Sequence, residues 1–144
     1  MMILKIAISL FVFIECLNVM TLYFRPSSKI GNGVGVFNAL HKSQEDEEIS
    51  TFVGYLINWV AGTKLIFIML GIVIVLVGNE TTQLYAVIAL IISILSFYWR
   101  LYPTIKKLDG KNQISPKGYA KTLNLMIISF LSVFAVALLL YFFL

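Results

Sequence analysis

The sequence predicts an all-α integral membrane protein, in which four transmembrane helices form a bundle and a short amphipathic segment follows the first helix. The first observation is composition: 60% of the 144 residues are hydrophobic and 12% are charged, whereas a soluble globular domain is about half apolar and about a quarter charged. The second observation is four long apolar runs, each at or above the roughly 20 residues that a membrane-spanning helix needs. The runs lack the alternation of strands, and a backbone in lipid must satisfy its own hydrogen bonds, so they are interpreted as helices.

The whole chain is expected to form one domain. Its helices are expected to cover residues 2-24, 52-77, 82-102 and 116-144. The dipeptide Arg25-Pro26 marks the end of the first helix, and Asp109-Gly110 is interpreted as a turn after the third. Ser115-Pro116 is interpreted as the N-cap and first helical residue of the fourth.

Basic residues are distributed very unevenly between the expected connections. Nine lie in or beside the first and third connections, whereas the second connection has none and the N-terminal side has only Lys5. The nine are Arg25, Lys29, Lys42, Arg100, Lys106, Lys107, Lys111, Lys117 and Lys121. Because cytoplasmic loops carry the excess of Lys and Arg, both termini are predicted to lie on the non-cytoplasmic side of a plasma membrane. The aromatic residues that suit the cytoplasmic interface are Tyr98, Trp99, Tyr102 and Tyr119.

Two opposite charges lie inside the apolar runs. Glu15 is ten residues before Arg25, and Lys64 is twelve residues after Phe52. At about 1.5 Å of rise per residue, these positions have similar depths on consecutive antiparallel helices. Each charge alone in hydrocarbon would cost about 2.5–3.5 kcal/mol. The sequence therefore predicts an intramembrane Glu15–Lys64 ion pair.

Amides and small residues extend this polar face. Asn18 follows Glu15 by three residues and shares its helix face, and Asn58 is expected at the depth of Asn18 as a second rung. Small and polar residues of the second helix are Gly54, Asn58, Ala61, Lys64 and Gly71. Those of the third helix form a stripe of Thr82, Ala86, Ala89, Ser93, Ser96 and Arg100. Such residues allow close helix packing, so the stripe is expected to contact another helix, a second subunit or a cavity.

The remaining motifs favour structural interpretations. The run "GNGVG" at 31–35 lacks the spacing and the preceding strand of a phosphate-binding loop, so it is interpreted as a flexible turn before a short surface helix. Cys16 is expected to be a packed thiol, and His41 has no second ligand nearby for a metal. No cofactor or metal is expected. Arg100 with Lys106 and Lys107 either holds a phosphate or lipid headgroup or, on the simpler interpretation, only sets the topology.

The candidate binding residues are Glu15, Lys64, Asn18, Asn58, Ser93 and Arg100. The ion pair is either a structural staple between two helices or part of a solute or proton pathway. Three functions stay open: a small transporter or channel with the pair as gate or proton-coupled switch, a non-catalytic subunit or helper, and a lipid-active enzyme. The first is favoured. An enzyme is not supported, because no second intramembrane carboxylate or buried histidine is evident. The expected partners are membrane lipid and either further copies of the chain or another membrane protein, and not nucleic acid.

Overall fold

The computed structural model describes residues 2–143. Their regular secondary structure is all helical, and four helical segments are long and apolar enough to span a membrane. The elements are α1 (Met2–Phe24), η1 (Val34–Val36), α2 (Asn38–Ser43), α3 (Glu47–Val77), α4 (Glu80–Leu95), η2 (Ser96–Tyr98), α5 (Leu101–Gly110) and α6 (Tyr119–Phe143). The four apolar segments are α1, α3, α4 continued through α5, and α6. The all-helical class predicted from the sequence is confirmed.

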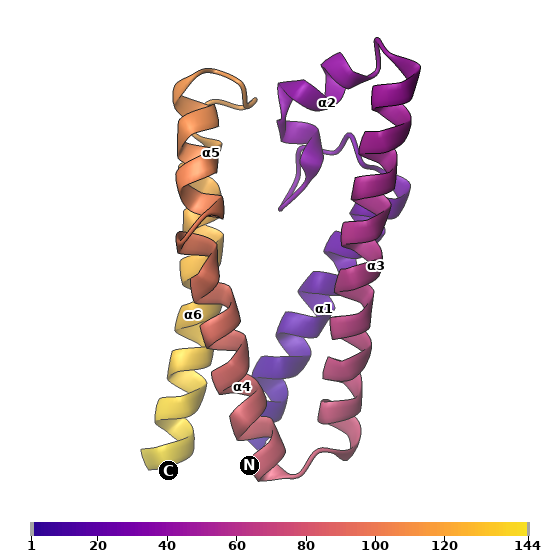
Figure 1. Ribbon diagram of the computed structural model, residues 1–144. Helices are drawn as coiled ribbons and strands as arrows, with labels where there is room; N and C mark the ends of the chain where they lie inside the picture. The colour runs from indigo at the N-terminus through magenta and orange to yellow at the C-terminus, as the bar shows by residue number, and fades with distance from the viewer. Residues whose placement is uncertain (1, 144) are drawn as a thin grey trace.

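The helices form two pairs that meet at one end of the molecule. Figure 1 shows α1 beside α3, and α4 and α5 beside α6, with both termini and the α3–α4 turn at the same end. At that end a buried cluster joins α1, α4 and α6, and its fully buried members include Leu4, Ile8, Val87 and Phe134. Toward the other end the two pairs diverge, and the α1–α3 connection lies there with the α5–α6 turn (Figure 1).

Two helix starts follow from side-chain caps. Asp46 accepts a hydrogen bond from the Ile49 N–H at 3.0 Å, and α3 therefore begins at Glu47, five residues before the expected start at residue 52. Asn79 accepts from the Thr82 N–H at 2.8 Å and caps α4 in the same way. The acidic run at residues 45–48 thus supplies the cap and the first turn of α3, ahead of its apolar part.

The cap of α6 differs from the one expected. The Asp109 carboxylate, which is buried, accepts from the Gly118 N–H at 2.9 Å and from the Ala120 N–H at 3.0 Å. α6 begins at Tyr119, so the assignment of Ser115-Pro116 to its first turn is wrong. The expected turn at Asp109-Gly110 is instead the last turn of α5, because α5 continues to Gly110 rather than ending at residue 102.

The small-residue stripe of the third apolar segment faces away from the other helices. Its members Thr82, Ala89, Ser93, Ser96 and Arg100 are exposed, and only Ala86 is partly buried. The buried side of this segment instead carries Gln83, Val87 and Phe97. The prediction that the stripe contacts another helix of the chain is therefore wrong except at Ala86, because larger side chains occupy the helix interface. Cys16, expected to be packed, is also exposed.

Candidate functional site

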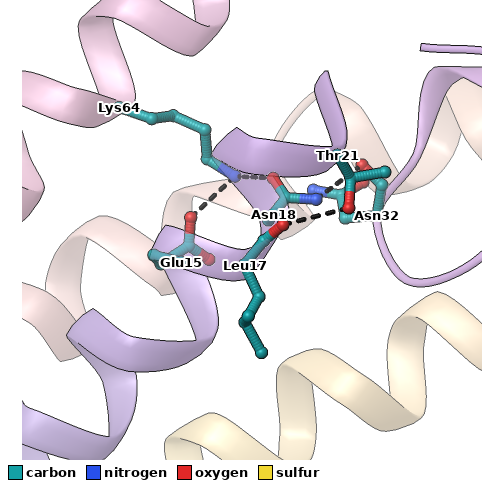
Figure 2. A network of polar contacts seen from close by, with 6 residues as sticks. All are labelled: Glu15, Leu17, Asn18, Thr21, Asn32 and Lys64. Atoms are coloured by element: carbon teal, nitrogen blue, oxygen red, sulfur yellow. Dashed lines mark hydrogen bonds and ion pairs between the residues drawn. The ribbon is translucent and has the colours of Figure 1, made fainter. Parts of the chain in front are cut away.

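An ion pair joins α1 to α3. The Lys64 Nζ lies 2.7 Å from Glu15 Oε2, as Figure 2 shows, so the predicted pair is present. Glu15 is thirteen residues from the start of α1 at Met2, and Lys64 is thirteen residues from the end of α3 at Val77. Both therefore lie about 20 Å from the end of the molecule that holds the termini. The two side chains are 20% and 25% exposed, for Glu15 and Lys64 respectively.

Apolar contacts between α1 and α3 set the register that brings the charges together. The buried residues of this interface are Val19, Leu22, Ile57, Ala61 and Ile68. Ala61 is fully buried, and a Cβ on Gly71 would come within 2.6 Å of Val12 Cγ2, so both small residues permit a close helix approach. The predicted small face of α3 is thus used at Ala61 and Gly71, whereas Gly54 has open space.

Asn18 extends the ion pair into a longer polar network. Its Oδ1 accepts a hydrogen bond from Lys64 Nζ, and its Nδ2 donates to the Asn32 carbonyl at 3.1 Å. Figure 2 shows Lys64 reaching from α3 to both Glu15 and Asn18 of α1, with Asn32 on the far side of Asn18. Close by, Thr21 Oγ1 donates to the Leu17 carbonyl at 3.0 Å within α1.

The predicted Asn18–Asn58 rung is wrong. Asn58 is exposed on α3, and Asn18 is already engaged by Lys64 and by the Asn32 carbonyl. The reason is angular: Asn58 is six residues from Lys64, which places it about 120° away around the helix. Depth alone therefore does not pair two side chains.

The segment that Asn18 holds lies between the two helix pairs, and residues 29–37 are called the wedge segment below (Figure 1). Val34 packs against the α1–α3 interface, whereas Val36 is fully buried in the cluster formed by η2, α5 and α6. Tyr119 of α6 donates its hydroxyl to the Gly31 carbonyl at 2.7 Å. The Tyr119 side chain is also buried, so it does not belong to the expected interfacial aromatic belt.

Backbone hydrogen bonds fasten the wedge segment to the α5–α6 connection. Phe37 forms an isolated antiparallel bridge with Ile114, and the Ser115 N–H donates to the Val36 carbonyl at 2.8 Å. Just beyond the segment, the Asn38 N–H donates to the Gln113 carbonyl at 3.0 Å. The first and third connections, predicted to share one side of the membrane, thus touch each other.

The glycines of "GNGVG" have a structural explanation. A Cβ on Gly33 would lie 2.5 Å from the Ser28 carbonyl oxygen, and a Cβ on Gly35 would lie 2.2 Å from that of Ser27. Gly31 has a φ of +65°, which favours glycine. The run is therefore a tightly fitted backbone turn rather than the flexible turn expected from its composition.

The other candidate residues lie apart from this network. The Ser93 carbonyl accepts from Ser96 Oγ at 2.6 Å, and the Arg100 guanidinium carbon lies 5.3 Å from the centre of the Trp99 ring. The structure instead adds Asn32 and Tyr119, which sequence reasoning did not assign to the site. Asn32 acts through its backbone carbonyl, so its side chain carries no signal of the contact.

Comparison of this chain with protein-family models, with curated proteins and with solved structures found no match. Within residues 2–143, no group of three or more His, Cys, Asp or Glu residues is arranged to hold a metal ion. The chemistry at the site consists of one carboxylate, one ammonium group, one amide and the backbone carbonyl that the amide holds.

Proposed function

We propose that this protein is a small membrane transporter or channel in which the Glu15–Lys64 pair is a charge-controlled gate. The observation that carries the proposal is the continuous set of contacts from Glu15 through Lys64 and Asn18 to the Asn32 carbonyl. Through these contacts an ionisable pair inside an apolar helix bundle is coupled to a segment that lies between two helix pairs.

The gate requires that the four apolar segments span a bilayer. Large apolar side chains exposed along all four support this placement, for example Phe13, Phe67, Ile92 and Phe142. In an aqueous setting such surfaces would aggregate. The distribution of basic residues supports a cytoplasmic location for the end that holds the wedge segment. Both termini would then lie on the opposite side.

Proton uptake by Glu15 supplies the switch. Once the Glu15 carboxyl is neutral, the Lys64 ammonium has no counter-charge, which in hydrocarbon costs about 2.5–3.5 kcal/mol. Its flexible stem allows the ammonium to move toward the nearer headgroups. Asn18 then loses its Lys64 partner, and its hold on Asn32 weakens. The wedge segment moves, and a route opens between the α1–α3 pair and the α5–α6 pair.

Proton flux into liposomes tests the gate with four proteins: the parent, Glu15→Gln, Lys64→Met and the double variant. The parent should carry protons in a pH-dependent manner. The double variant should remain folded but lose that pH dependence, because neither position then carries an ionisable side chain. A stable double variant with the parent's flux and pH dependence would show that the pair is only a structural staple.

A second candidate is a non-catalytic subunit, which the exposed stripe on α4 favours. Ala89 and Ser93 leave a narrow, weakly apolar face on which another membrane helix fits closely. On this account Ala89→Leu abolishes association with the partner and leaves the melting temperature of the chain unchanged. Ala61→Leu is the matched control, since Ala61 is fully buried and overpacking there costs about 1–3 kcal/mol. A partner that still co-purifies with Ala89→Leu would exclude this face.

A further inference from the structure

A positively charged surface covers the end of the α5–α6 hairpin and is called the basic surface. Its six side chains are all exposed and come from the residue before α5, from α5, from the connection and from the start of α6. They are Arg100, Lys106, Lys107, Lys111, Lys117 and Lys121. None of these side chains takes part in the gate network described above.

This hairpin offers the basic surface no counter-charge. Asp109 is the one acidic residue in the sequence after Glu80. Its carboxylate is buried and accepts hydrogen bonds from the Gly118 and Ala120 N–H groups, so it is committed to capping α6. Within residues 2–143, none of the six basic side chains forms an ion pair. No acidic side chain of the described residues therefore neutralises these six charges.

The acidic residues at the same end of the molecule belong to the other helix pair. They form one exposed run at the α2–α3 corner: Glu45, Asp46, Glu47 and Glu48. Figure 1 shows this corner on the α1–α3 side, whereas the basic surface is on the α5–α6 side. Asp46 is also used as the cap of α3. The acidic corner therefore attracts cations, whereas the basic surface attracts anions.

Aromatic side chains place the basic surface at the level of lipid headgroups. Trp99 is 77% exposed, and the Arg100 guanidinium lies over its ring at 5.3 Å. Lys106 Nζ lies 5.6 Å from the centre of the Tyr102 ring. Arg100 is twenty residues after Glu80 at the start of α4, a length of about 30 Å, which matches the hydrocarbon thickness of a bilayer. The lysines of α5 then lie in the headgroup layer, where exposed tryptophan is favoured.

We propose that the basic surface binds the phosphate headgroups of anionic phospholipids. The proposal rests on the membrane placement proposed above, and not on the gate. Soluble phosphate would satisfy the same charges, but it would not account for an exposed Trp99 beside Arg100 at the hydrocarbon boundary. Anionic lipid is therefore expected to gather around α5 and α6 and to avoid the α2–α3 corner.

Native mass spectrometry of the purified chain with phosphatidylglycerol or phosphatidylcholine tests this. Phosphatidylglycerol should bind more tightly, and Lys106→Gln/Lys107→Gln should weaken its binding by at least about tenfold, since each lysine near an anionic surface contributes about fivefold. The matched control Lys5→Gln/Lys42→Gln removes the same charge elsewhere and should change binding by less than about twofold. Both double variants should keep the melting temperature of the parent.

Three results would overturn the proposal: equal binding of the two lipids, equal losses in the two double variants, or displacement of the lipid by millimolar inorganic phosphate. The last would assign the surface to a soluble phosphate compound. Extraction of the parent chain from membranes by alkaline carbonate is measured in parallel. Release of the parent by carbonate would instead contradict the membrane placement on which the proposed function depends.

Discussion

At the scale of single residues, the Glu15–Lys64 pair places two opposite charges between apolar helices. Each charge is acceptable inside an apolar bundle only because the other lies 2.7 Å away. Lys64 gains a further acceptor from Asn18. Because the two side chains remain 20% and 25% exposed, the penalty for breaking the pair is smaller than for a fully enclosed one.

Replacement of either partner alone should destabilise the chain. Glu15→Gln or Lys64→Met is expected to cost about 1–3 kcal/mol, because the remaining charge is left without its partner, and the double change should recover much of this. Thermal melting of the four proteins in one detergent gives the coupling energy. Single variants that melt like the parent would mean that the two groups are not energetically coupled.

Asp109 is expected to matter more for stability than Ser115. Asp109→Ala removes the acceptor of two backbone N–H groups at the start of α6 and a negative charge at a helix N-terminus, which together cost about 1–2 kcal/mol. Ser115→Ala, the control, should change stability little, because its hydroxyl accepts only a 3.3 Å hydrogen bond from Lys29. Equal losses for the two variants, measured by thermal melting, would contradict this capping assignment.

At the scale of elements, the wedge segment depends on glycine. Gly35→Ala should destabilise the chain by about 1–3 kcal/mol and loosen residues 29–37, because its Cβ would meet the Ser27 backbone at 2.2 Å. Gly54→Ala provides the matched control: it lies within α3 with nothing near its added Cβ, so it should be neutral or stabilise by up to about 1 kcal/mol. Melting temperatures of both variants measure the difference, and an unchanged Gly35→Ala protein would show that the turn can rearrange.

The sequence was sufficient to predict the elements whose signals are local. The end of α1 follows from Arg25-Pro26, and the Glu15–Lys64 pair was predicted from opposite charges at similar depth on neighbouring helices. The Asp109 cap, by contrast, joins residues nine and eleven positions apart across a turn, which no local pattern specifies. The direction in which the α4 stripe faces could not be predicted either, because small residues favour close helix contact but do not specify which helix they contact.

At the scale of the whole molecule, topology is the first property to establish. Both termini are expected outside and the α5–α6 connection inside, since nine of the eleven basic residues lie at one end. Cysteines placed at Ser115 and at the C-terminus, in a chain without Cys16, should react with an impermeant maleimide only at the C-terminus in intact cells. Labelling of the Ser115 position from outside would show that the orientation is the reverse of the predicted one.

In the proposed gate, the charge on Glu15 controls the wedge segment. Hydrogen–deuterium exchange of the chain in lipid nanodiscs tests this directly by comparing the parent with Glu15→Gln. Amides of residues 29–37 are expected to exchange at least about fivefold faster in Glu15→Gln, equivalent to about 1 kcal/mol of lost protection. Amides of α6 beyond Tyr119 should lose less protection than those of residues 29–37. Unchanged exchange of residues 29–37, in a variant that has lost the pair, would show that the pair does not hold the segment in place.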